Sequence, residues 1–242
     1  MAVIEIENLT KDFAVGFWRK RPVRALDALS LEVRAGEIFG FLGPNGAGKS
    51  TTLKLLMHLL HPTSGSARIL GRPAGDTAMH ERIGYLPENP YFYDYLTPRE
   101  LLTFMGRLFG LAGAPLARRV RDLVGEVGLA AAADVQLRKF SKGMVQRLGI
   151  AQALVNQPEV VFLDEPMSGL DPLGRMEVRR IVTGLRERGV TVFLSSHILP
   201  DVEAMCDRVA ILHRGRLQEA GTLEDILRAR IAGHEIILSG WT

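Results

Sequence analysis

A glycine-rich segment near residue 45 carries the clearest chemical signal in the sequence. It matches the pattern G-x-x-x-x-G-K-[ST] in full, follows a short apolar run, and reads Gly43-Pro44-Asn45-Gly46-Ala47-Gly48-Lys49-Ser50, with Thr51 next. Glycines permit backbone angles that aim several N–H groups at one point, and the positive end of a following helix adds to them. Lys49 would supply a charge for the β- and γ-phosphates of ATP, and the Ser50 hydroxyl would hold Mg²⁺. The alternative is a glycine-rich turn with an incidental lysine.

Two adjacent carboxylates, Asp164 and Glu165, end a second apolar run that begins at Val160. Neighbouring residues of a strand point to opposite faces, so we expect the two acids to have different tasks. Asp164 would hold Mg²⁺ through water, and Glu165 would polarise the attacking water as a general base. A strand that simply ends in solvated acids is the alternative.

Two further segments could contact phosphate. Ser141 opens a predicted helix, whose N-terminus is a second possible phosphate site, although Ser-x-Gly caps many helices. His197 ends the predicted strand that closes with Ser195 and Ser196, where it could reach a γ-phosphate. A structural cap is the alternative for this histidine.

The elements that must position these groups form an α/β pattern. Strands are predicted at residues 3–7 (an edge strand), 29–33, 37–42, 160–163 and 190–194, and a helix after Ser50 carries Leu53, Leu56, Met57 and Leu60 on one face. Residues 37–42 are nearly all apolar, as expected of a strand buried on both faces. The order of strands and helices predicts the layered core of a P-loop NTPase, with an N-terminal antiparallel β region.

The middle third of the sequence is predicted to be helical. A capping box at Thr97-Pro98-Arg99-Glu100 begins a helix with the apolar stripe Leu101, Leu102, Met105, Leu108 and Phe109. Further helices are predicted from Pro115 to Val127, from near Ser141, and after Asp171, which is followed by Pro172. We therefore expect one domain over residues 1–222, a helical lobe inserted at about 89–158, and a short helix and strand extension at 223–242.

The bulk properties exclude several classes of protein. A net charge of +3 over 242 residues does not indicate nucleic acid binding, and the single cysteine, Cys206, fits a reducing cytosol. The N-terminus has no secretion signal, and no uncharged apolar run approaches the roughly 20 residues of a membrane-spanning helix. We expect a soluble protein whose membrane role, if any, depends on a partner.

Taken in this order, the segments at Gly43, Ser141, Asp164, Ser168-Gly169-Leu170-Asp171 and His197 resemble the nucleotide-binding subunits of the ABC transporter family. The resemblance runs from Ile4 to about Gly221. It implies an ATPase that dimerises head to tail around two ATP molecules, as a homodimer or a heterodimer. It also implies a separate transmembrane permease, at the cytoplasmic face of the inner membrane, with export as the expected direction.

The same resemblance assigns further roles to single residues. Ser141 and Gly143 would contact the γ-phosphate held by the other subunit, and His197 would contact it from the same subunit. Asp171 would belong to the loop that crosses the dimer interface, and Phe13 would stack on adenine, although a core phenylalanine is the alternative.

Two positions depart from the usual family pattern. The signature Leu-Ser-Gly-Gly-Gln here reads Phe140-Ser141-Lys142-Gly143-Met144, which keeps the serine and one glycine and adds positive charge at Lys142. Glu88 stands where the family usually has a glutamine; a carboxylate can bind Mg²⁺ or its water, but it donates a hydrogen bond only when protonated. Both departures resemble the ATPase subunits of bacterial export systems with separate permease chains.

The segment from Glu88 to Tyr95 is the predicted permease docking site. All four tyrosines, Tyr85, Tyr91, Tyr93 and Tyr95, fall in one stretch with Phe92, and surface aromatics often mark an interface. The alternative is that these rings pack beneath the helical lobe. A second segment, Phe17 to Arg21, could touch anionic lipid headgroups or form a solvated hairpin tip.

Two rival functions belong to other classes. A soluble ABC-type ATPase of a cofactor-assembly machine would share the motifs and lack the permease. A DNA-repair ATPase would need a long heptad segment, and a two-domain translation factor would need a second phosphate loop; the sequence has neither. A plain P-loop kinase would not need Ser141 or His197.

Overall fold

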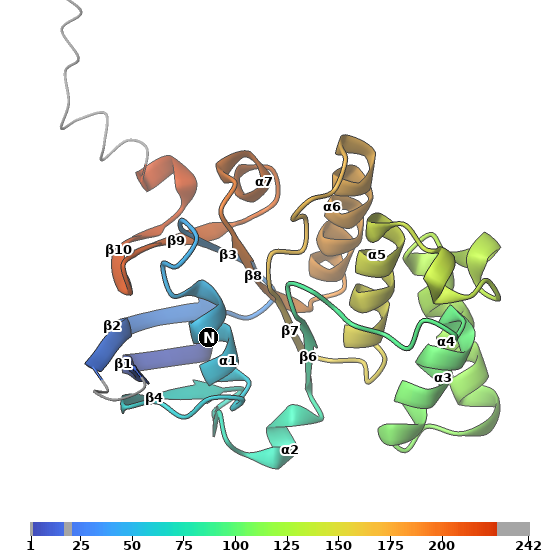
Figure 1. Cartoon of the computed structure of the whole chain (residues 1–242), viewed down its shortest axis with the longest axis horizontal. Helices are drawn as coiled ribbons and strands as arrows, with labels where there is room; N and C mark the ends of the chain where they lie inside the picture. The colour runs from blue at the N-terminus through green and yellow to red at the C-terminus, as the bar shows by residue number, and fades with distance from the viewer. Residues whose placement is uncertain (1, 17–20, 227–242) are drawn as a thin grey trace, which may run out of the picture.

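Two β-sheets with helices around them make up the chain (Figure 1). The structure, a computed structural model, describes residues 2–16 and 21–226. The tip at 17–20 and the segment 227–242, which includes most of the expected C-terminal extension, lie outside the described residues.

The larger sheet has six strands in the order β10-β9-β3-β8-β7-β6. Its strands are β3 (Ile38–Leu42), β6 (Ile83–Leu86), β7 (Val160–Leu163), β8 (Thr191–Ser196), β9 (Arg208–His213) and β10 (Arg216–Gly221). Neighbours from β9 to β6 are parallel, and only β10 pairs antiparallel, with β9. All the parallel strands therefore end at one edge of the sheet, which is where the candidate site residues follow them.

Both faces of this sheet are buried, as the apolar runs predicted. Ile38 packs into a core formed with the helices α5 (Lys142–Ala153) and α6 (Pro172–Glu187). Its neighbour Phe39 packs into a second core beneath the smaller sheet. On β7, Val161 and Phe162 divide between the same two cores. Alternate residues of each strand therefore point to opposite faces of the sheet, and each face packs against its own hydrophobic core.

The smaller sheet is antiparallel, in the order β2-β1-β4-β5, and confirms the predicted N-terminal β region. Its strands are β1 (Ala2–Val15), β2 (Arg21–Arg34), β4 (Ser64–Ile69) and β5 (Arg72–Pro73). The expectation of an edge strand at residues 3–7 is wrong. Ile4 pairs with Val33 on one side and Ile69 on the other, so β1 lies inside the sheet.

Seven helices complete the described part of the chain. They are α1 (Lys49–Leu56), α2 (Thr77–His80), α3 (Pro98–Leu108), α4 (Gly113–Glu126), α5 (Lys142–Ala153), α6 (Pro172–Glu187) and α7 (Leu199–Glu203), with 3₁₀ turns at Ala130–Ala132 and Leu137–Lys139. Helices α3, α4 and α5 follow one another between β6 and β7 (Figure 1). This agrees with an inserted helical segment, while the domain limits 1–222 and 89–158 stay predictions. None of these helices is long and apolar enough to cross a membrane.

The predicted helix ends are partly confirmed. The Thr97 side chain accepts from the Glu100 N–H and the Glu100 carboxylate accepts from the Thr97 N–H, so the capping box is present. The predicted apolar stripe of this helix is wrong at its end, because Leu108 is 67% exposed and Phe109 follows the helix. The helix after Ser50 is shorter than predicted, since it ends at Leu56.

Candidate functional site

The glycine-rich loop joins the end of β3 to the start of α1. Gly48 has a φ of 109° at the N-terminus of α1, and a Cβ there would lie 2.6 Å from the Ala25 carbonyl oxygen. A Cβ on Gly43 would lie 2.4 Å from the Leu212 carbonyl oxygen. Both positions therefore need glycine for the loop to keep its path between neighbouring strands.

Lys49 is buried at the centre of this loop. Its Nζ donates to the Gly43 carbonyl at 2.7 Å and to the Pro44 carbonyl at 3.2 Å, and it lies 3.1 Å from the Glu165 carboxylate. The ammonium group is thus fixed between the loop and the end of β7.

Asp164 lies between two hydroxyl groups. The Ser50 hydroxyl donates to Asp164 Oδ1 at 3.2 Å, and the Ser195 hydroxyl donates to the same oxygen at 2.6 Å. Ser195 Oγ also accepts from the Glu165 N–H at 2.9 Å. Hydroxyl groups from α1 and β8 therefore meet at the carboxylate that directly follows β7, and Ser195 links Asp164 to Glu165.

Glu165 faces different partners from Asp164, as predicted, but strand alternation is not the reason, because β7 ends at Leu163 and both acids follow it. Its backbone has a φ of 50°, an uncommon conformation for a residue with a side chain and one that often occurs at functional sites. One carboxylate oxygen lies 3.1 Å from Lys49 Nζ, and the other lies 2.8 Å from His197 Nδ1. The alternative of solvated acids is wrong, because both carboxylates are buried.

His197 is not a helix cap. The residue that precedes α7 is Ile198, whose N–H donates to Ser196 Oγ at 3.0 Å, whereas the His197 ring faces Glu165.

A cavity of about 260 Å³ opens beside these groups. Its lining consists of Ala25, Asn45, Gly46, Gly48, Lys49, Ser50, Thr51, Glu88 and Glu165. Glu88, which follows β6 on an exposed loop, is therefore beside the glycine-rich loop, as the sequence predicted. Phe13 is not among the lining residues. It is half-buried on β1, with Lys11 Nζ 5.3 Å from its ring centroid, so it is not the core phenylalanine of the alternative either.

Ser141 and Gly143 line a different cavity, of about 480 Å³, between the start of α5, the loop before α6 and the first turns of α6. Ser141 caps α5, because its Oγ accepts from the Met144 N–H at 3.3 Å. Asp171 lines the same cavity and caps α6 through an acceptor bond from the Gly174 N–H at 2.9 Å. Ser141 and Gly143 thus lie on a second surface of the chain. Other predicted site residues lie close together beside the first cavity: Lys49, Ser50, Glu88, Asp164, Glu165 and His197.

The aromatic segment divides into buried and exposed parts. Tyr85 belongs to β6, where burial and the Asp164 carboxylate raise its pKa to about 12. Tyr91, Tyr93 and Tyr95 are 92%, 56% and 62% exposed. The alternative of rings packed beneath the helices holds for Phe92, which contacts the core, and is wrong for these three tyrosines.

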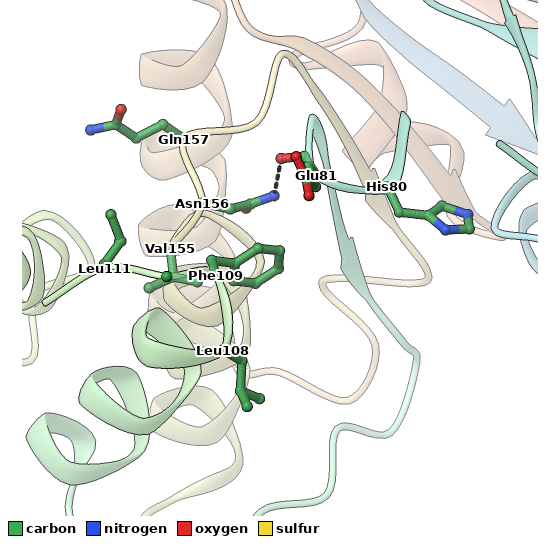
Figure 2. Close-up of a pocket in the computed structure, with 9 residues that line it drawn as sticks. His80, Glu81, Leu108, Phe109, Leu111, Val155, Asn156 and Gln157 are labelled. Carbon is green, nitrogen blue, oxygen red and sulfur yellow. Dashed lines mark hydrogen bonds between the residues drawn. The ribbon is translucent and has the colours of Figure 1, made fainter. Parts of the chain in front are cut away.

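A larger cavity, of about 700 Å³, lies elsewhere. Figure 2 shows it between α2, the end of α3 and the loop after α5, with His80 pointing away from the Phe109 and Leu111 side chains. The Asn156 amide donates to the Glu81 carbonyl at its rim. No candidate site residue lines this cavity.

No separate role for Ser195 follows from the sequence pattern, although this residue connects Asp164 to Glu165. The available signal was its place at the end of an otherwise apolar strand, where a buried hydroxyl needs a partner.

Comparison with known proteins decides the family. The model of the ABC transporter family matches residues 26–168, more than half of the chain. The chain belongs to the ABC transporter family. This ABC transporter subunit binds and hydrolyses ATP, as the resemblance of its motifs implied.

Individual relatives support this ABC assignment. The chain is 51% identical over 240 residues to an uncharacterized ABC transporter ATP-binding protein of Synechocystis, covering 98% of the chain and 68% of the relative. It is 35% identical over 242 residues to the Nod factor export ATP-binding protein I of Burkholderia lata, covering 99% of the chain and 77% of the relative. A solved ATP-binding subunit of an ABC transporter superposes with a TM-score of 0.80 at 33% identity, covering 94% of this chain and 93% of that one.

Proposed function

We propose that the chain drives export through a separate permease, by closing head to tail with a second nucleotide-binding subunit around two ATP molecules. The observation that carries this proposal is the placement of Glu165 between Lys49 and His197 at the glycine-rich loop. The relative named for Nod factor export supports the direction.

Mg²⁺ fits the oxygen donors beside the loop. The Ser50 hydroxyl and the Asp164 carboxylate lie 3.2 Å apart, and Glu88 lines the same cavity. Mg²⁺ prefers oxygen ligands and usually keeps several waters and substrate phosphates beside one or two protein groups, so this small donor set is sufficient for it. When bound, this ion would neutralise charge on the β- and γ-phosphates.

The protein groups then divide the chemistry between them. Lys49 and the loop N–H groups bind the phosphates, and Glu165 accepts the proton of the attacking water. His197 holds the Glu165 carboxylate in position and contacts the γ-phosphate. Ser141 and Gly143 of the second subunit complete the site, and Phe13 stacks on adenine.

The decisive experiment compares the wild type with Glu165→Gln. Turnover of ATP should fall by about 10²- to 10⁴-fold, because the amide cannot accept the proton. ATP should bind normally and trap a dimer, measured by light scattering after gel filtration. A variant that hydrolyses ATP at the normal rate, or that stays monomeric with ATP bound, would overturn the proposal.

We propose that the permease docks beside Glu88 on the surface formed by Tyr91, Tyr93 and Tyr95, at the cytoplasmic face of the membrane. The ring centroids of Tyr93 and Tyr95 lie 5.8 Å apart, so the two rings form one continuous surface.

Replacing Tyr91 and Tyr93 by serine should release a co-purified polytopic membrane protein and leave the basal ATPase unchanged. Tyr85→Phe, inside β6, is the matched control. Absence of any membrane protein from wild-type preparations would favour the cofactor-assembly ATPase instead.

A further inference from the structure

We propose that Lys142 contributes a positive charge to the γ-phosphate of the ATP held by the second subunit. It would thereby set the affinity of dimer closure and its dependence on salt. The inference deepens the proposed function and rests on its head-to-tail dimer. It concerns a residue at which this chain departs from the glycine that the family signature usually has.

Lys142 has the right position for this contact. It is the first residue of α5, a helix of 12 residues, and stands between Ser141 and Gly143, the two residues proposed to contact that phosphate. The positive end of the helix dipole and the ammonium group therefore act on the same cavity.

The other charged groups that line this cavity are already engaged. Asp171 caps α6, Glu177 accepts from Arg180 at 3.2 Å, and Arg147 donates to the Val127 carbonyl at 3.0 Å. Lys142 makes no hydrogen bond or ion pair with any described residue of the chain. Its charge is thus available to a group from outside the chain.

The lysine side chain is exposed and runs along the rim of the cavity toward the loop before α6. A Cβ on Gly169 would lie 2.3 Å from Lys142 Nζ, so the ammonium group lies directly against that glycine. Gly169 belongs to the loop before α6. Both the close approach of Lys142 and a φ of 66° favour glycine at this position. The loop proposed to cross the dimer interface and the free cation therefore share one surface.

The lining also contains the carboxylates of Asp171 and Glu177, so only Lys142, whose charge has no partner among the described residues, favours an anion here. The terminal phosphate of ATP is such an anion, whereas ADP lacks that group. The Lys142 contact should therefore favour closure on ATP over closure on ADP, and it should weaken as salt screens the charges.

The test measures the dimer dissociation constant in the Glu165→Gln background with Mg²⁺-ATP, by analytical ultracentrifugation at about 50 mM and about 300 mM NaCl. Adding Lys142→Gln should weaken the dimer by about tenfold at low salt and flatten its salt dependence. Lys142→Arg should keep most of the affinity. Lys139→Gln, an exposed lysine three residues earlier, is the matched control and should change neither quantity.

Nucleotide binding to the monomer separates this effect from misfolding, since Lys142→Gln should leave it unchanged. A Lys142→Gln dimer with unaltered affinity and salt dependence would overturn the inference and leave the sandwich intact. Failure of the Glu165→Gln parent itself to dimerise with ATP would instead overturn the proposed function.

Discussion

The cavity beside Lys49 and the cavity beside Ser141 hold their functional groups in different ways. In the first, Lys49, Asp164 and Glu165 are buried and each contacts at least one other member of the site. In the second, Ser141 and Lys142 are exposed, and Ser141 bonds only within its own helix end. The first cavity is organised by the chain itself, whereas the second presents its groups outward. This is the arrangement expected of a surface that completes a site on another molecule.

The largest expected effect tests the first cavity alone. Lys49→Met should lower ATP binding and turnover by at least about 10³-fold, because the replacement removes the buried charge that faces the phosphates. Nucleotide binding to the monomer measures the first quantity and phosphate release the second. Lys54→Met, on the exposed side of the same helix, should leave both unchanged. Equal loss in the two variants would point to a damaged helix rather than a lost contact.

The next effect should separate the two cavities. Ser141→Asp retains a helix-capping side chain but brings a negative charge to the second cavity, so turnover should fall by about 10²-fold while monomeric ATP binding persists. Ser141→Asn caps the helix without a charge and should lose much less activity. If monomeric ATP binding fell in parallel with turnover, the two cavities would not be independent.

A smaller effect tests how the first cavity is organised. Ser195→Ala removes the hydroxyl between Asp164 and the Glu165 N–H, which should cost about 1–3 kcal/mol of unfolding free energy. Turnover should fall only severalfold, since the serine positions the acids and does not touch the reacting atoms. Urea unfolding and ATPase assays measure the two quantities, with Ser196→Ala as the neighbouring control. Unchanged stability would show that Ser195 does not hold the carboxylates.

The smallest effect lies outside both cavities. Thr97→Ala should lower the free energy of unfolding by about 1 kcal/mol through loss of the capping box, with no change in ATPase activity. Thr103→Ala, inside α3, serves as a control without a cap to lose. A marked loss of activity in Thr97→Ala would mean that the start of α3 is coupled to the catalytic groups.

Local chemistry made much of the site predictable. The glycine spacing fixed the loop, the apolar run placed Asp164 and Glu165 at a strand end, and Thr97 with Glu100 marked a helix start. Contacts between residues far apart in the sequence could not be predicted from such local patterns. Ser195 meets Asp164 across 31 positions, and β1 lies inside its sheet because β4, some 60 residues later, pairs with it. Leu108 and Phe109 fit a helical apolar period, but the tertiary packing that would have buried them is absent among the described residues.

Mixing two inactive variants tests the central claim that the two cavities of different subunits form one site. Lys49→Met keeps an intact Ser141 surface, and Ser141→Asp keeps an intact glycine-rich loop, so a mixed dimer contains one complete site. We predict that the mixture hydrolyses ATP well above the sum of the separate variants. Activity equal to that sum, with mixed dimers confirmed by affinity tags, would contradict the account.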